Sequence, residues 1–217
     1  MNGDTPKCCK CPRTEIIHTD PATDEAYCLF HAPVDHKGMS PAAFQDKVLE
    51  EIARSKAAGE EICDLSAAVF PAADFQGITF DHAIDFSLAE FTQFADFSGA
   101  KFTEKADFSG ATFTEDADFR LAKFTQGVYF FRTTFTLASF GGAEFTQTAD
   151  FRRSTFTKDT IFMSAKFTQE ANFSDAVLGR ASFNDATFKQ ADFSRAKFTQ
   201  DVYFIRTPLM LTRPWAN

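Results

Sequence analysis

Residues 95–119 read ADFSGAKFTEKADFSGATFTEDADF, and phenylalanine returns in this stretch at alternating steps of five and six residues. An α-helix cannot use this spacing, because at 3.6 residues per turn the rings would point to all sides of the helix. A single long strand fails as well, since its side chains alternate every two residues. A chain that turns a corner about every five residues does fit, because the middle residue of each short side points inward. The stretch therefore predicts a solenoid whose coils stack and bury one another.

The same pattern extends from Leu65 to Phe204 and gives 27 apolar centres, 25 of them phenylalanine. Two residues before each centre stands a small or β-branched residue, which is alanine in 19 cases. The chain has 29 Phe against three Tyr and one Trp. Aromatic residues at binding surfaces usually include Tyr and Trp, whose polar atoms suit such positions. We therefore predict that the phenylalanines fill a core. Phe94 and Phe131 lie off the register and are expected to cover outer faces or, alternatively, to mark a contact site.

The words ADF-SG, ANF-SD and DLSAA resemble the pentapeptide-repeat family, whose unit is A(D/N)Lxx with Leu or Phe at the centre. The resemblance covers residues 65–204 and implies an all-β fold, a right-handed quadrilateral β-helix with four units per coil. It implies about seven coils and, at about 4.8 Å per coil, a rod about 30 Å long. The six-residue steps depart from the family's strict period of five. The extra residue falls at polar places such as Glu104-Lys105, where we expect a corner bulge that leaves the inward ladder intact.

Residues 1–39 are expected to form a small segment that holds four of the five cysteines. Cys8 and Cys11 form a CxxC pair, and sixteen residues later Cys28 and His31 form a CxxH pair. Three thiolates and one imidazole suit a tetrahedral structural Zn²⁺ ion, which would stabilise a segment too small for a core of its own. The segment resembles the small zinc-knuckle or zinc-ribbon families. We therefore predict a Zn²⁺ site formed by Cys8, Cys11, Cys28 and His31.

The sequence also allows alternatives to this ligand set. Cys9 could replace Cys8 as a ligand, whereas His18 and His36 are less well spaced. A disulfide framework is disfavoured, because nothing in the sequence indicates secretion. A catalytic zinc needs an open coordination position, which four protein ligands do not leave. Cys63 falls on the inward small-residue register of the repeats and is expected to be buried.

Residues 40–62 are predicted to form a capping helix and a linker. Ser40 is a good N-cap, Pro41 suits the first helical position and Gly59 can end the helix. The helix is expected to cover the open face of the first coil, since solenoids need caps at their ends; the alternative is a helix that binds a partner. Its apolar stripe comprises Phe44, Val48, Leu49 and Ile52.

The β-helix is placed at residues 63–206, and residues 207–217 form a C-terminal tail. The apolar residues of the tail lie outside the repeat register. They are expected either to fold over the last coil or to join two last coils in a homodimer, as in some members of the family. These residues are Leu209, Met210, Leu211 and Trp215.

The net charge of −8 argues against direct nucleic-acid binding, which depends on neutralising phosphates. Residues 71–207 are closer to balance, with 18 acidic and 14 basic side chains. The sequence has no run of about 18 apolar residues that would span a membrane. Its start lacks the apolar core of a signal peptide. We therefore expect no membrane partner and a cytoplasmic location.

No nucleophile–base set or phosphate-binding loop is found in the sequence, so we predict a protein that is not an enzyme. The aspartates of the repeats, such as Asp96, Asp107 and Asp118, suit a solvated face and hydrogen bonds at corners rather than acid–base catalysis. The first hypothesis is a protein-interaction scaffold with an unidentified protein partner. The family resemblance implies the alternative, because some members mimic duplex DNA and bind type II topoisomerases such as DNA gyrase.

Overall fold

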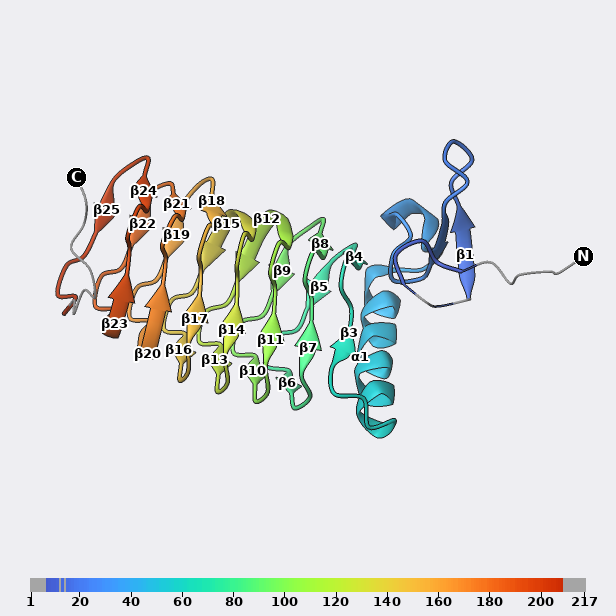
Figure 1. The fold of residues 1–217 in the computed structure, drawn as a ribbon, viewed down its shortest axis with the longest axis horizontal. Coiled ribbons are helices and arrows are strands. Elements are labelled where there is room, and N and C mark those ends of the chain that lie inside the picture. The colour runs from blue at the N-terminus through green and yellow to red at the C-terminus, as the bar shows by residue number, and fades with distance from the viewer. Residues whose placement is uncertain (1–6, 12, 14, 209–217) are drawn as a thin grey trace, which may run out of the picture.

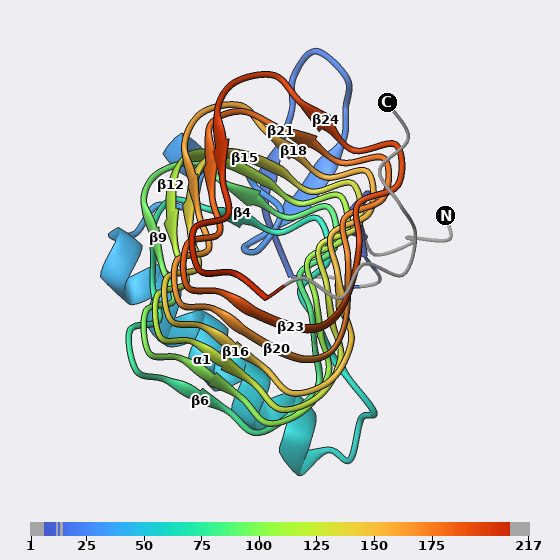
Figure 2. The same ribbon diagram turned by 90° about the vertical axis from the view of Figure 1, so that its left-hand side faces the viewer.

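The computed structural model describes residues 7–11, 13 and 15–208. These residues form a rod of stacked coils with one helix, α1 (Pro41–Ala57), and a small hairpin at its N-terminal end (Figure 1). The hairpin pairs β1 (Ile16–Thr19) with β2 (Ala26–Cys28), and η1 (Val34–His36) follows it. Viewed along the rod, successive coils lie over one another (Figure 2).

Each coil has four sides, and strands of successive coils pair in parallel along every side. Side 1 comprises β3 (Cys63–Asp64), β7 (Ile84–Asp85), β11 (Ala106–Asp107), β14 (Val128–Tyr129), β17 (Ala149–Asp150) and the ends of β20 (Lys166–Asn172) and β23 (Thr187–Asp192). Side 2 comprises β4 (Val69–Phe70), β8 (Glu90–Phe91), the starts of β12 (Thr112–Asp118) and β15 (Thr134–Ser139), β18 (Thr155–Phe156), β21 (Val177–Leu178) and β24 (Lys197–Phe198).

The other two sides complete the coil. Side 3 comprises β5 (Ala73–Asp74), β9 (Ala95–Asp96), the ends of β12 and β15, β19 (Thr160–Ile161), β22 (Ala181–Ser182) and β25 (Val202–Tyr203). Side 4 comprises β6 (Thr79–Phe80), β10 (Lys101–Phe102), β13 (Lys123–Phe124), β16 (Glu144–Phe145) and the starts of β20 and β23. The predicted β-helix with four repeats per coil is confirmed.

The phenylalanine centres form the core of the rod. From Phe70 to Phe193 they are all buried, and the two later ones, Phe198 and Phe204, are half-buried. Rings on the same side of successive coils stack nearly parallel, as between Phe91 and Phe113, whose centroids are 4.4 Å apart at 1°. Rings on different sides meet edge to face, as between Phe97 and Phe108 at 87°, or tilted, as between Phe119 and Phe124 at 40°. The stacked and edge-to-face arrangements are favourable for aromatic pairs, so a continuous aromatic stack runs through the coils.

Two kinds of corner alternate around the coil. After sides 1 and 3, the second residue beyond each centre has a positive φ, whether it is glycine, as in Gly99 (65°), or another residue, as in Leu121 (57°). The amide of the next residue donates to the carbonyl oxygen of the centre, for example from Ala100 to Phe97 at 3.0 Å. These features describe a type II turn, in which that residue needs a left-handed conformation.

The aspartate before the centre supports the turn corners. In the repeat around Phe97, the Asp96 carboxylate accepts a hydrogen bond of 2.8 Å from the amide of Ser98. Equivalent bonds are made by Asp107 to Ser109 and by Asp118 to Arg120. The prediction that these carboxylates serve corner hydrogen bonds is therefore confirmed, but Asp118 is buried and does not lie on a solvated face.

Corners after sides 2 and 4 commonly carry a threonine directly after the centre. Its hydroxyl donates to a carbonyl oxygen of the preceding coil, as from Thr103 to Phe80 (3.4 Å) and from Thr125 to Thr103 (3.0 Å). All six-residue steps occur at these corners. Between β12 and β15 the register shifts after Phe113, yet Phe113 still faces Phe135 and Ala117 still faces Ala138. The extra residue therefore bulges at the corner and leaves the inward ladder intact, as predicted.

Gly179 occupies one of these corners at a close backbone approach. A Cβ atom at Gly179 would lie 2.6 Å from the backbone oxygen of Lys158 in the preceding coil. Because a backbone oxygen cannot rotate away, we expect Gly179→Ala to lower the free energy of unfolding by about 1–3 kcal/mol through overpacking. Chemical denaturation will measure this loss.

Gly77→Ala provides the comparison for this substitution. Gly77 has φ +66° but nothing within 4 Å of an added Cβ. Gly77→Ala should lower the free energy of unfolding only through the strain of a left-handed alanine, by about 1–2 kcal/mol. Equal stability of wild type and Gly179→Ala would contradict the close approach.

Helix α1 covers the N-terminal end of the rod, as predicted (Figure 1). The Ser40 side chain caps it by accepting a hydrogen bond of 3.2 Å from the amide of Ala43. At the other end, Gly59 (φ 70°) donates to Lys56 and Glu60 donates to Ser55, which is a Schellman motif. The buried face of the helix consists of Phe44, Val48, Ile52 and Ser55, with Leu49 partly buried.

The helix is fixed to the first coil by both apolar and polar contacts. Phe44 meets Phe70 edge to face, with ring centroids 5.7 Å apart. The Gln45 side-chain amide bonds both the amide and the carbonyl of Asp74, and the Asp74 amide lies 2.8 Å from Gln45 Oε1. The helix thus covers an end of the ladder that would otherwise be open to water.

Three further sequence expectations concern single residues or short segments. Cys63 is fully buried, as predicted, and burial raises its thiol pKa to about 12. The predicted roles of the C-terminal tail fall on residues 209–217, which lie outside the described residues. In the part of the chain that the structure describes, no helix has both the length and the apolar run needed to cross a bilayer.

Candidate metal centre

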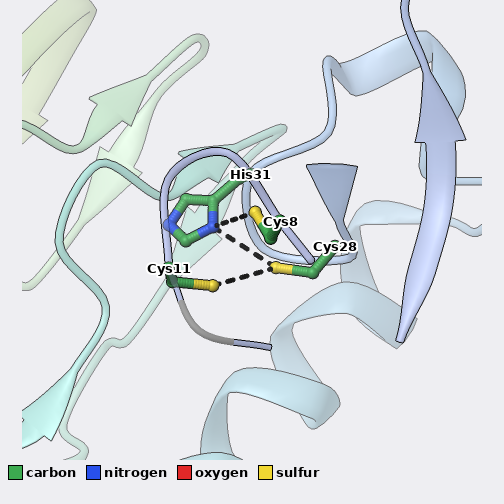
Figure 3. Close-up of side chains that lie close together, drawn as sticks. All are labelled: Cys8, Cys11, Cys28 and His31. Atoms are coloured by element: carbon green, nitrogen blue, oxygen red, sulfur yellow. Dashed lines mark hydrogen bonds between the residues drawn. The ribbon is translucent and has the colours of Figure 1, made fainter. Parts of the chain in front are cut away.

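The N-terminal segment brings Cys8, Cys11, Cys28 and His31 into one cluster (Figure 3). Cys8 and Cys11 lie on a turn before β1, where the Cys8 amide donates to the carbonyl of Arg13. Cys28 ends β2, and the following turn is closed by amides of His31 and Ala32 that donate to the Cys28 carbonyl. Each half of the predicted motif is therefore a tight turn, and the β1–β2 hairpin holds the two turns side by side.

The four ligand atoms lie within 4.8 Å of one another. Cys11 Sγ is 3.7 Å from Cys28 Sγ, and His31 Nδ1 is 3.3 Å from the sulfur atoms of both Cys8 and Cys28. Two sulfurs at about 2.3 Å from one tetrahedral Zn²⁺ ion would be separated by about 3.8 Å. The sulfur separation and the donor set therefore both fit a zinc ion.

The orientation of His31 also fits metal binding. Its Nε2 atom lies 2.8 Å from the carbonyl oxygen of Ser66. Since a carbonyl can only accept, Nε2 must carry the proton, and Nδ1 then presents its lone pair to the thiols. A carbonyl partner on the second ring nitrogen is typical of metal-ligating histidines. Burial lowers the pKa of His31, which favours the neutral form that a metal needs.

The thiols differ in how readily they ionise. Burial raises the pKa of Cys28 to about 12, and the neighbouring Cys11 and Cys8 oppose its ionisation as well. Burial also opposes ionisation of Cys8, but hydrogen bonds from the backbone at Cys28 and Lys10 outweigh it and lower the pKa of Cys8. A cation at the centre would remove the penalty at Cys28, because a coordinating thiol is deprotonated.

Arg13 links the cluster to the rod. Its guanidinium lies 3.5 Å from Cys11 Sγ, donates to Glu51 of α1 at 2.8 Å and donates to the carbonyl of Asp64 in β3 at 3.2 Å. With the bond from His31 to Ser66, this gives the cluster two direct contacts with the first coil. Sequence reasoning did not find Arg13 or Ser66, because neither belongs to a ligand motif.

A buried ammonium lies behind the second turn of the cluster. Lys37 Nζ donates to the carbonyls of Leu29 (2.6 Å) and Phe30 (3.2 Å) and lies 4.3 Å from the ring centroid of Phe44. Burial lowers the pKa of Lys37 to about 8. Together, the hydrogen bonds and the contact with the Phe44 ring link the chain after Cys28 to α1. No local pattern indicated this role, since a lone lysine in a short segment is usually exposed.

The other candidate ligands lie elsewhere. Cys9 is exposed and its amide bonds the carbonyl of Ala26, so Cys8 and not Cys9 joins the cluster. His18 and His36 stack on each other, with ring centroids 3.8 Å apart, and neither is in the cluster. All five cysteines belong to the described part of the chain and are free thiols, so they form no disulfide framework.

A family model matches the repeats, and none of the ranges that it matches includes the cluster. The profile of pentapeptide repeats (9 copies) matches residues 75–122, 86–134, 108–155, 130–177, 151–197 and 162–208. A search of curated proteins finds no match. Among solved structures, the chain is similar to a trypsin-treated variant of QnrB1, a plasmid-mediated fluoroquinolone resistance protein, with 18% identity and a TM-score of 0.24 over 65% of this chain and 86% of that one. The repeat matches together span more than half of the sequence, and the chain therefore belongs to the pentapeptide-repeat family.

Proposed function

We propose that the chain is a non-enzymatic interaction protein, a rigid β-helical rod whose N-terminal end is closed by α1 and a structural zinc site. The observation that carries the proposal is the use of the repeated residues. The phenylalanine centres fill the core, and aspartates of the repeats accept hydrogen bonds at the corners. What is left for function is an outer surface on which side chains recur at the coil spacing, which suits binding of another protein.

The zinc site is proposed as structural because its four ligands are all protein side chains. Cys8, Cys11, Cys28 and His31 would hold the ion, and such a closed set leaves no position for a substrate. The contacts from His31 to Ser66 and from Arg13 to Asp64 tie the segment to the first coil. The ion would thus stabilise the cap of the rod.

Site-specific photocrosslinking of the full chain in cells tests the interaction role. A benzophenone amino acid is placed at exposed positions on different sides, for instance Leu88, Glu104, Leu121 and Lys158. We expect discrete crosslinked protein bands from one or two neighbouring positions and none from the others. A folded protein that gives no crosslinked partner from any side would contradict the proposal.

The alternative is a DNA-mimicking protein that binds DNA gyrase. A mimic needs acidic rows along the rod, but four carboxylates of the described rod are paired with cations of neighbouring coils. Arg180 pairs with Asp159, and Glu144 lies between Lys123 and Lys166. These pairs favour the scaffold role. A gyrase supercoiling assay separates the two, because a mimic must inhibit or protect the enzyme and a scaffold for other partners has no effect.

A further inference from the structure

Two arginines of the rod lack the acidic partner that the others have. No carboxylate among the described residues lies within ion-pair distance of Arg132 or Arg153. Every other arginine that the structure describes forms an ion pair with a carboxylate. These paired arginines are Arg13, Arg54, Arg120, Arg152, Arg180, Arg195 and Arg206.

The two arginines occupy equivalent places in successive coils. Each is the second residue after its centre on side 1, with φ 57°, and both are exposed. The Arg132 amide donates to the carbonyl of Arg152 at 3.0 Å, which fixes the stacking of the two corners. The Phe131 ring contacts two guanidinium groups, with its centroid 5.1 Å from that of Arg132 and 5.5 Å from that of Arg152. We call Phe131, Arg132, Arg152 and Arg153 the arginine corner.

Nearby carboxylates are already engaged. Both oxygens of Asp175 are bonded by Arg195, at 2.6 and 2.7 Å. Both oxygens of Asp150 are bonded by Arg152. Neither Arg132 nor Arg153 therefore has an ion pair of its own in the described part of the rod, although Arg153 lies close enough to Asp175 to help lower the pKa of that carboxyl.

The repeats themselves show that the fold does not require Phe131 or Arg152. The corner needs a backbone amide at the first position after the centre, and that position is serine in the other coils of side 1. At the arginine corner the same position is Phe131 or Arg152. The serines are Ser66, Ser87, Ser109, Ser174 and Ser194.

We propose that the arginine corner binds the carboxylates of an acidic segment in a partner protein. Guanidinium groups bind carboxylates through paired hydrogen bonds. Arg132 and Arg153 stand one coil apart, about 4.8 Å, so they can engage two acidic side chains, while Phe131 contacts the apolar part of the segment. A nucleic acid fits less well, because the net charge is −8 and two cations without ion-pair partners cannot track a phosphate backbone. This inference rests on the proposed interaction role.

The test uses a fluorescently labelled oligoglutamate peptide and the full chain, with binding followed by fluorescence anisotropy. The double variant Arg132→Ala/Arg153→Ala should bind at least about tenfold more weakly than wild type, as expected for two lost charge-assisted hydrogen bonds. The control Arg180→Ala/Arg206→Ala removes the same net charge from another part of the rod and should stay within about twofold of wild type. Circular dichroism checks that both variants are folded.

Three results would overturn the proposal: no binding by wild type, equal losses in the two double variants, or binding of an oligothymidine strand as tight as that of oligoglutamate. Failure of the arginine corner to bind an acidic segment can be distinguished from failure of the interaction role. If the acidic peptide does not bind but photocrosslinks to a partner persist, the rod still binds a protein and only its recognition by the arginine corner is wrong.

Discussion

Replacement of Phe119 by alanine is expected to lower the free energy of unfolding by about 3–5 kcal/mol. The side chain is fully buried and stacks on Phe97 at 4.8 Å and on Phe140 at 5.0 Å. It also meets Phe108 edge to face. Because rigid coils on both sides fix the spacing, the cavity cannot close by collapse. Urea denaturation followed by far-ultraviolet circular dichroism measures the loss.

Phe94→Ala is the matched control for this substitution. Phe94 is the same residue type in a neighbouring coil, but it lies off the ladder and is 46% exposed. Its removal should change the free energy of unfolding by no more than about 0.5 kcal/mol. If the two variants lost similar amounts of stability, the aromatic stack would not be the main source of stability in the rod.

Loss of the proposed zinc ion should have the second large effect. Structural zinc contributes about 10–16 kcal/mol of apparent free energy in zinc-finger peptides at neutral pH. We therefore expect Cys28→Ala, or a strong chelator added to wild type, to unfold residues 7–39. The bond from His31 to Ser66 should then be lost, and the first coil should become less protected. Metal analysis and hydrogen exchange by mass spectrometry measure these changes.

Cys9→Ala tests whether the effect belongs to the cluster. Cys9 is adjacent in sequence to a proposed ligand but is exposed and outside the cluster. This variant should retain one zinc ion per chain and wild-type exchange rates. Wild-type protein that contains no zinc after purification in its presence, or a Cys28→Ala variant that retains it, would refute the site.

The coil architecture could be predicted from the sequence because one residue type marks every inward position. The alternation of two corner types was not predicted, although its signals are present. Threonine follows the centre at the corners after sides 2 and 4, as at Thr103 and Thr125, and the longer steps occur only there. The left-handed residues at the other corners are harder to recognise in the sequence, because some of them are not glycine, for example Leu121 and Arg132.

The candidate site was predictable in its ligands but not in their surroundings. Spacing identified Cys11, Cys28 and His31 and left Cys8 and Cys9 as alternatives. The hairpin pairing selects Cys8, because the Cys9 amide bonds the carbonyl of Ala26 in β2. The partner of His31 is Ser66, 35 residues away, and such a contact depends on how the segment docks. Local sequence patterns contain no information on docking.

The alternation of corner types sets a unit for growth of the chain. Deletion of one repeat would place the sequence of a type II turn at a threonine corner. Deletion or insertion of two repeats, which is half a coil, leaves each sequence at a corner of its own type. The resemblance between residues 117–130 and 191–204, offset by 74 residues, obeys this rule. Phe119 follows the strand of side 3 and Phe193 that of the opposite side 1, and both precede a left-handed turn. Gene duplication can therefore lengthen such a protein in half-turn increments while every corner keeps its chemistry.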